Sequence, residues 1–331
     1  MCCTNSNKSL STTLFTICGK NDKTFFIFDP KMNIDKLNYQ CSYLKCILES
    51  LFLSVIYVSS LYVWNSQHSR DHPSTIKKRF LSVSFMLIFS PLYTWYFIND
   101  KTKVPIWYWL GLKWDGIFMS AASSLFLTCI LFLGSICLIC CKNIQLKNIF
   151  SIENIKSKLT DLIWLRNYVV APISEEFTFR ACIIPLLLQC FEPMTTIFIC
   201  PIFFGAAHFN QWIERMRAGV PCLDAFILSV FQFMYTTIFG AYSALLFIST
   251  GNVLGPIMAH KFCNHMGFPD FREMFQFQEP KRSCLLVLSL VGLILWCILI
   301  KYTTDPGIYS NQMNWTEINQ CNTINSSNNI L

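Results

Sequence analysis

Charged residues are scarce in this sequence, where they make up 14% of 331 residues, against about a quarter in an ordinary soluble domain. Hydrophobic residues make up 53%, and the mean hydropathy is positive at +0.42. This composition excludes an ordinary soluble globular domain. We therefore expect an all-α, polytopic membrane protein, in which runs of about 20 apolar residues cross about 30 Å of hydrocarbon.

The sequence also lacks a basic stripe interleaved with stacking aromatic residues. Its net charge of +7 is spread over several loops, which excludes nucleic acid as a partner and favours the lipid bilayer, where loop charges orient the spans. The 17 cysteines lie mostly inside apolar runs, where Cys behaves as a small hydrophobic residue. No basic region leads into an apolar stretch near the N-terminus, so we expect the first span, and no cleaved signal peptide, to direct insertion.

Apolar runs divide the chain into three parts. A polar N-terminal segment (1–41) precedes a membrane domain (42–302), and an Asn-rich tail (303–331) is predicted to be disordered. The span-length rule predicts about eight transmembrane helices enclosing a polar catalytic cavity. The predicted segments are 42–64, 81–98, 116–140, 162–190, 194–212, 223–249, 251–268 and 284–302.

The fourth of these segments carries an unusual cluster of charge, Glu175, Glu176 and Arg180. Ionisable groups at membrane depth are costly and normally face a cavity or a partner, so the cluster indicates a functional site. On a helix, Glu176 and Arg180 are four positions apart and meet, whereas Glu175 is turned about 100° away. We expect Arg180 to hold Glu176 and leave Glu175 free as a base, with Pro172 kinking or breaking the helix.

Histidines stand in two later segments. Three small residues, at 205–207, precede His208 and permit another helix to approach closely, which would deliver His208 to a helix interface. His260 and Asn264 are four positions apart and share a helical face, so both could donate hydrogen bonds to one oxyanion. A carboxylate paired with an imidazole can activate water. A purely structural network of ion pairs and packed histidines remains the alternative.

Other chemistries are open at these positions. His208, His260 and a glutamate could form a zinc site of two histidines and one carboxylate, although the sequence has no HExxH motif. Cys263, near His260, is the best candidate for a cysteine nucleophile. Ser174 could be a nucleophile, but a serine before two glutamates is typical of a helix N-cap.

Three motifs occur in order on three hydrophobic segments: EExxxR at Glu175–Arg180, FxxxH at Phe204–His208 and HxxxN at His260–Asn264. This combination resembles the type II CAAX prenyl endopeptidases, the Ras-converting enzymes of the CAAX protease and bacteriocin-processing family. The similarity extends from about residue 42 to about 300 and includes stretches typical of the eukaryotic branch, at 60–64 and 70–80. Bacterial relatives that share only the three motifs, among them bacteriocin-immunity proteins, are the alternative subfamily.

The resemblance implies an endoplasmic-reticulum protease of eight helices whose active site opens to the cytosol. It would remove the last three residues of farnesylated or geranylgeranylated CAAX proteins, such as Ras-type GTPases, without a metal or other cofactor. Carried over to this chain, Glu175 and His208 would activate water, and His260 and Asn264 would bind the oxyanion. Glu176 and Arg180 would support the site.

Two alternatives to a metal-independent protease remain. One is a zinc-dependent membrane metalloprotease that uses the same residues, and the other is a non-enzymatic transporter or assembly factor. The sequence leaves open the preferred prenyl group and CAAX residues, the orientation of the termini and the oligomeric state.

Overall fold

The computed structural model describes residues 34–64, 68–98, 104–142, 152–309 and 311. Within these ranges every regular element is a helix, which confirms the predicted all-α class. The elements in chain order are α1 (Ile34–Ser60), α2 (Pro73–Phe97), α3 (Ile106–Trp109), α4 (Ile117–Leu131), α5 (Leu133–Cys141), α7 (Ile152–Thr160), α8 (Leu162–Leu165), η1 (Arg166–Val170), α9 (Ala171–Glu176), η2 (Phe177–Ile183), α10 (Ile184–Leu188), α11 (Pro193–Ala207), α12 (Asn210–Arg217), α13 (Cys222–Thr250), α14 (Leu254–Met266), α15 (Phe271–Met274), α16 (Lys281–Thr303) and η3 (Pro306–Tyr309).

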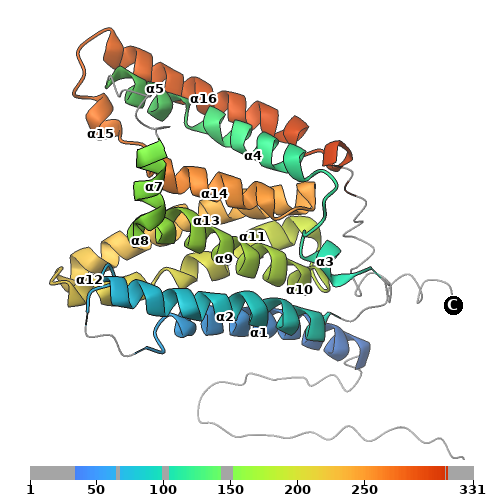
Figure 1. The fold of residues 1–331 in the computed structure, drawn as a ribbon. Coiled ribbons are helices and arrows are strands. Elements are labelled where there is room, and N and C mark those ends of the chain that lie inside the picture. Colours follow the sequence, from blue (N-terminus) through green and yellow to red (C-terminus); the bar gives the residue numbers. More distant parts are fainter. Residues whose placement is uncertain (1–33, 65–67, 99–103, 143–151, 310, 312–331) are drawn as a thin grey trace, which may run out of the picture.

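The long helices form three groups that lie roughly parallel (Figure 1). Helices α1 and α2 lie side by side at one edge, and α4, α5 and α16 form the opposite edge. Between them stand the column from α8 to α10 and helices α11, α13 and α14. Short elements cap the ends, with α12, α7 and α15 at one end of the bundle and α3 at the other. The central group carries all three predicted motifs.

Among the described residues, four helices are long and apolar enough to cross a membrane, namely Tyr43–Ser60 within α1, α2, α13 and α16. Helices α4 and α5 form a fifth candidate, bent by 70°. The predicted segments 162–190, 194–212 and 251–268 are also largely helical, but they do not meet the same conditions of length and hydropathy. A polytopic membrane protein is therefore confirmed, while the number of eight spans stays a prediction.

The predicted break at Pro172 is wrong, because the column stays helical from Leu162 to Leu188. Its backbone instead changes from α to π geometry in η1 and η2, on either side of α9. The Ala171 N–H bonds to the carbonyl of Arg166, five residues back. The hydrogen-bond register thus shifts just before the proline, which has no N–H to donate. Single π turns inside α-helices are frequent at functional sites.

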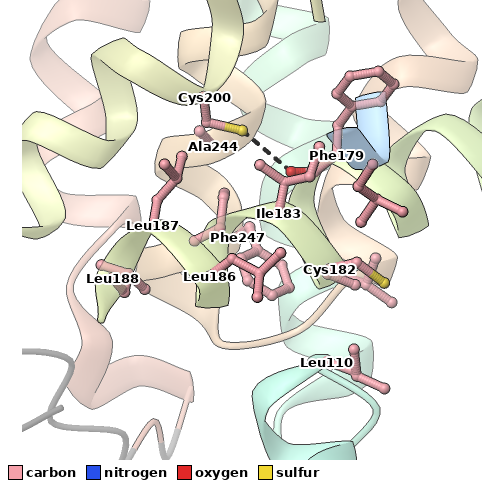
Figure 2. Packing of buried hydrophobic residues seen from close by; sticks show 14 of the residues in the cluster. Leu110, Phe179, Cys182, Ile183, Leu186, Leu187, Leu188, Cys200, Ala244 and Phe247 are labelled. Atoms are coloured by element: carbon pink, nitrogen blue, oxygen red, sulfur yellow. Dashed lines mark hydrogen bonds between the residues drawn. The ribbon is translucent and has the colours of Figure 1, made fainter. Parts of the chain in front are cut away.

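The largest buried cluster surrounds η2 and α10 (Figure 2). Phe179, Ile183 and Leu187 are each at most 1% exposed, and they pack against residues of α11 and α13 such as Cys200 and Phe247. The Cys200 thiol also donates to the Phe179 carbonyl at 3.1 Å. Tight van der Waals packing and hydrogen bonds between helices stabilise membrane bundles, because lipid tails are as apolar as the side chains and the hydrophobic effect does not drive helices together. The charged motif is therefore fixed by a closely packed column.

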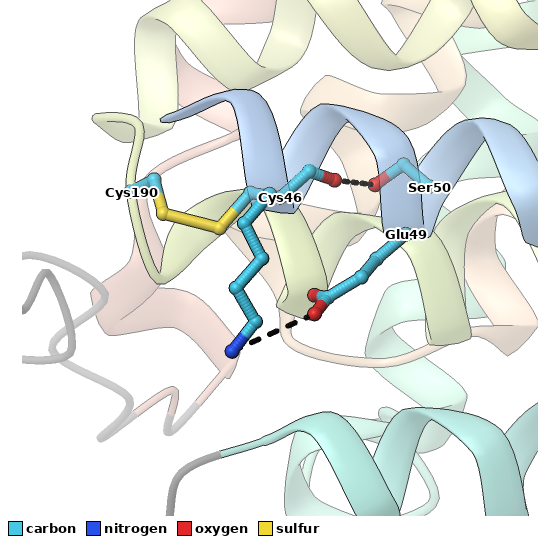
Figure 3. Close-up of a disulfide and its surroundings, with 5 residues drawn as sticks. Cys46, Glu49, Ser50 and Cys190 are labelled. Carbon is cyan, nitrogen blue, oxygen red and sulfur yellow. Dashed lines mark hydrogen bonds and ion pairs between the residues drawn. A yellow bond between two sulfur atoms is a disulfide. The ribbon is translucent and has the colours of Figure 1, made fainter. Parts of the chain in front are cut away.

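A disulfide joins Cys46 of α1 to Cys190, just after α10 (Figure 3). Beside it, Ser50 Oγ donates to the Cys46 carbonyl at 2.8 Å, and Lys45 and Glu49 form an ion pair of 3.7 Å. Treating the cysteines only as small hydrophobic residues therefore misses this pair, whose members lie 144 positions apart. The bridge ties α1 to the central column at one end of the bundle.

The ends of the membrane domain extend beyond the predicted bounds. Helix α1 begins at Ile34, inside the segment predicted to be polar and separate. At the other end η3 follows α16, Tyr309 is 1% exposed, and the Asn311 amide donates to the carbonyls of Ile248 and Ser249 at 3.1 and 3.0 Å. The start of the tail is thus packed against α13 and is not disordered as predicted. Residues 1–33 and 312–331 lie outside the described residues.

Candidate active site

Glu176 lies at the centre of the site with its side chain fully buried. Its Oε1 is 3.2 Å from Arg180 Nη1 and 2.6 Å from His260 Nδ1. Its Oε2 accepts a hydrogen bond of 2.5 Å from the Ser243 hydroxyl. The predicted contact between Glu176 and Arg180 is thus present, and the same carboxylate also links the column to α13 and α14.

Arg180 is fully buried as well, and its guanidinium lies over the ring of Phe204, 4.2 Å from the centroid. The Phe239 ring is 5.9 Å away. Among the described residues, none of its side-chain nitrogens has a well-aligned hydrogen bond, so the approach to Glu176 is an ion pair without good hydrogen-bond geometry. The aromatic faces supply part of the missing stabilisation, because a desolvated cation is attracted to a ring quadrupole. Phe204 of the FxxxH motif therefore has a role beyond packing.

Glu175, by contrast, keeps 21% of its side chain exposed. Its Oε2 is 3.9 Å from His260 Nε2, too far for a direct hydrogen bond and close enough for one small group to contact both atoms. No described residue donates a hydrogen bond to this carboxylate. Adjacent glutamates therefore have opposite surroundings, as their helical phase predicts.

His208 caps α11, and its Nδ1 lies 2.8 Å from the Phe204 carbonyl. Since a carbonyl only accepts, Nδ1 carries the proton, and in the neutral ring Nε2 is left as an acceptor. His208 and Glu175 line the same two cavities. An imidazole with a free basic nitrogen thus shares a cavity with a carboxylate that forms no ion pair with an arginine or lysine among the described residues.

His260 and Asn264 both line the larger cavity, as expected from their common helical face. The Asn264 amide already donates to the Asn167 carbonyl at 2.9 Å, which fixes its position on the column. The Glu176 carboxylate can only accept from His260 Nδ1, so donation from Nε2 as well requires the imidazolium form.

Two cavities meet at these residues. The larger, of about 1350 Å³, is lined mainly by apolar side chains of α11, α13, α14 and α16. The smaller, of about 140 Å³, carries several charged groups from the loop after α1, α2, η1 and α12. Glu175, His208 and Phe204 line both. A site with an apolar chamber on one side and a charged chamber on the other suits a substrate with a lipid part and a polar part.

Ser174 is not a helix cap, because it stands inside α9. Its hydroxyl is 2.8 Å from the Tyr57 hydroxyl and donates to the Ala171 carbonyl at 3.2 Å. The predicted cap is wrong because the column begins at Leu162, and Asp161 caps it instead. Cys263 also lines the larger cavity.

Sequence reasoning missed Ser243, Tyr57 and Asn167, which hold Glu176, Ser174 and Asn264 in place. Ser243 had a weak signal as a hydroxyl in an apolar span beside the small residues Gly240 and Ala244. The other two contacts join positions about 100 residues apart, so the spacing of residues within one helix cannot predict them. In the described part of the chain, no three His, Cys, Asp or Glu side chains are grouped in a way that could hold a metal ion.

Comparison with known proteins gives a consistent result. The family profile described as "Type II CAAX prenyl endopeptidase Rce1-like" matches residues 158–266, which contain all three motifs. The chain is 39% identical over 274 residues to "CAAX prenyl protease 2" of Homo sapiens, covering 80% of this chain and 83% of that protein. Its identity to the protein of the same name in Rattus norvegicus is 36% over 267 residues, and the match covers 78% and 80% of the two chains.

A more distant relative with this name, from Caenorhabditis elegans, is 31% identical over 236 residues, or 71% of this chain and 87% of that protein. No solved structure matches the chain significantly. The similarity to the three relatives extends well beyond the motif segments, and all three come from animals.

Proposed function

This chain belongs to the Rce1-like family of type II CAAX prenyl endopeptidases, and from that premise we propose how its residues divide the work of peptide hydrolysis. The observation that carries the proposal is the partly exposed Glu175 beside the buried Glu176, at the junction of an apolar and a charged cavity. Membership of a protease family favours hydrolysis over the non-enzymatic transporter. The substrate is a prenylated CAAX protein, and the product is the same protein without its last three residues.

Glu175 and His208 activate the water. The Glu175 carboxylate or the Nε2 of His208 takes a proton as the water oxygen attacks the carbonyl carbon of the prenylated cysteine. The carbon–nitrogen bond then breaks, and the proton passes to the leaving amine of the tripeptide. Because Glu176 is occupied by Arg180, His260 and Ser243, it is not available as the base.

His260 and Asn264 stabilise the oxyanion that develops on the attacked carbonyl. His260 can do so by donating from Nε2, which faces the Glu175 side, while its Nδ1 is bonded to Glu176. The second amide hydrogen of Asn264 remains available after its bond to Asn167. Donors fixed before the reaction cost no reorganisation during it, and each is worth about 2.7–4 kcal/mol in the transition state.

The large apolar cavity accommodates the prenyl group, farnesyl or geranylgeranyl. Its walls include Phe239, Leu245, Leu293 and Trp296, and it reaches Glu175 and His208 at its polar end. A lipid buried there would hold the adjacent cysteine carbonyl at the catalytic residues, so that binding energy from a remote group positions the reacting bond. Ras-type GTPases are the expected substrates.

We place the protein in the endoplasmic reticulum with the charged cavity facing the cytosol. The ends of the bundle differ in charge. At one end stand the short helices α7, α12 and α15, which carry Lys156, Lys158, Arg215, Arg217 and Arg272, and the charged cavity, which adds Arg70, Arg79 and Arg166. Near the α3 end the described cations are Lys45, Lys113 and Lys301. Positive charge favours the cytosolic side. The Cys46–Cys190 disulfide lies at the opposite end, as an oxidising lumen would allow.

Cleavage of a prenylated CAAX peptide by purified variants tests the proposal. Glu175→Gln and His208→Ala are expected to lower kcat by about 100- to 10,000-fold, the usual contribution of acid–base catalysis. Glu279→Gln, which changes an exposed carboxylate at the start of α16, serves as the matched control and should retain full activity. A correctly folded Glu175→Gln protein with normal turnover would refute the assignment and favour a structural network.

The zinc alternative needs a separate experiment. The proposed chemistry uses only protein groups, so 1,10-phenanthroline should leave the rate unchanged. Inhibition by the chelator that added zinc reverses would instead support a metalloprotease.

A further inference from the structure

The smaller cavity contains a cluster of arginines that the hydrolytic steps above do not use. Arg70, Arg79 and Arg166 line it together with Glu214, and its inner end reaches Glu175 and His208. These arginines come from three separate parts of the chain: the loop before α2, α2 itself and the start of η1. Their convergence is therefore a product of the fold.

The cluster has more positive than negative charge. Glu214 accepts hydrogen bonds from Arg79 at 2.7 Å and from Tyr62 at 2.8 Å. Burial alone would raise the pKa of Glu214, but these hydrogen bonds and the arginine charges lower it below its ordinary value, so the group is ionised. Asp71 accepts from Arg166 at 2.8 Å. Glu214 and Asp71 thus take their hydrogen bonds from Arg79 and Arg166, and neither accepts one from Arg70.

Arg70 is the least satisfied of the three. Its guanidinium is 3.6 Å from Glu214 and 3.9 Å from Asp71, beyond hydrogen-bond distance in both cases. No described residue gives its side chain a hydrogen bond, and 42% of the side chain is exposed. It lines both cavities and lies beside Arg166, whose Nη1 donates to the Arg70 carbonyl at 3.1 Å.

The distance from this cluster to the catalytic residues matches a short peptide. Arg166 and Glu175 stand on one helical column, nine positions apart, which corresponds to at most about 13 Å along the axis. Three extended residues span about 10 Å. A tripeptide whose first amide lies at Glu175 and His208 would therefore bring its terminal carboxylate near the arginines.

Building on the proposed function, we propose that Arg70, assisted by Arg166, binds the C-terminal carboxylate of the tripeptide that is released. A guanidinium and a carboxylate match in shape and form two parallel hydrogen bonds. The prenyl group in the apolar cavity and the carboxylate in the charged cavity then fix the scissile bond from both sides. This arrangement selects a peptide with three residues, and a free terminus, beyond the prenylated cysteine.

The substrate itself provides the first test. Wild-type enzyme is given a farnesylated CAAX peptide with a C-terminal acid, the same peptide as a carboxamide, and a version extended by one residue. Loss of the charged contact should lower kcat/KM for the amide by about 10- to 100-fold, mainly through KM. The extended peptide should be similarly poor. Equal cleavage of acid and amide would overturn the inference while leaving the proposed function intact.

Variants assign the effect to residues. In Arg70→Gln, kcat/KM for the acid peptide should fall to the value that the wild-type enzyme has for the amide peptide. The kcat/KM of the variant for the amide peptide should equal that of the wild type. Arg282→Gln, which removes an exposed arginine at the start of α16, should keep the wild-type preference for the acid. Retention of that preference in both Arg70→Gln and Arg166→Gln would overturn the assignment. Failure of the wild-type enzyme to cleave the acid peptide would overturn the proposed function and this inference with it.

Discussion

At the scale of single residues, the site depends on the different surroundings of two adjacent carboxylates. Glu176 is fully buried and contacts a cation, an imidazole and a hydroxyl. Glu175 is partly exposed, and its Oε2 lies 3.9 Å from His260 Nε2. A helix turns neighbouring side chains about 100° apart, so one glutamate can be fixed while the next faces a cavity. The same short motif therefore supplies both a structural group and a reactive one.

This difference predicts opposite effects of the same substitution. Glu176→Gln leaves Arg180 fully buried without a counter-charge, and breaking a buried pair in this way destabilises a protein by about 3–5 kcal/mol. Glu175→Gln removes a partly exposed charge that pairs with no arginine or lysine in the described ranges, and the stability of the protein should change by less than about 1 kcal/mol. Unfolding midpoints in detergent measure both.

Both variants should be inactive, but for different reasons. Glu175→Gln should be folded and lack the catalytic base, whereas Glu176→Gln should lose activity because its structure is destabilised. A Glu176→Gln/Arg180→Met double variant, which has no unpaired charge, should recover part of the lost stability. Equal stability losses for both glutamates would contradict the separation of roles.

Local spacing was enough to predict the contact between Glu176 and Arg180, because both residues lie on one helix four positions apart. It could not predict that His260 would bond to Glu176 through Nδ1, or that Ser243 would bond to the other oxygen. Those contacts depend on how α13 and α14 dock against the column. The chemical types of the site residues are visible in the sequence, whereas their hydrogen-bond partners are set by tertiary packing.

At the scale of elements, the close approach of α11 and α13 positions His208. A Cβ added to Gly205 would lie 2.1 Å from Thr237 Oγ1 and 3.0 Å from Phe233 Cδ2 on α13. The prediction that small residues before His208 admit a second helix is confirmed at this glycine. Gly240 of α13 has the same function on the other side, where an added Cβ would lie 2.9 Å from Pro201 Cβ.

Gly205→Ala is therefore expected to push α11 away from α13. Overpacking of this kind costs about 1–3 kcal/mol, and a shift of about 1 Å at a catalytic group can lower the rate 100-fold. Ala206→Leu is the matched control, since Ala206 is exposed and its side chain can grow without meeting α13. Activity and thermal midpoint should both fall in the first variant and stay near wild type in the second. Normal activity of Gly205→Ala would show that His208 tolerates movement of its helix.

The column from α8 to α10 shows where element prediction fails. Its length and polar residues are apparent in the sequence, from which Pro172 is predicted to kink or break the helix. In η1 the hydrogen-bond register shifts just before Pro172, and the helix continues through the proline. Helical periodicity alone does not reveal such a shift, because it changes the phase by only one residue.

At the scale of the whole molecule, the two ends of the bundle have different chemistry. The end with α12 and α15 carries the charged cavity and most of the described loop cations. The other end carries the Cys46–Cys190 disulfide and the packing of Tyr309 and Asn311 against the rest of the bundle. Loop charges in the sequence did not settle the orientation, because lysines occur on both sides. In the fold most of these charges lie at one end of the bundle, and this difference predicts which end of the bundle, and so which side of the site, faces the cytosol.

Site-resolved labelling in sealed microsomes tests that direction. Cys222, exposed at the start of α13 on the cation-rich end, should react with a membrane-impermeant maleimide without permeabilisation. A cysteine introduced as Trp114→Cys, at a position 85% exposed near the other end, should react only after the membrane is permeabilised. Mass spectrometry identifies each labelled peptide and should show Cys46 and Cys190 linked. The reverse labelling pattern would place the charged cavity in the lumen, where prenylated cytosolic proteins could not reach it, and would contradict the proposed access of substrate from the cytosol.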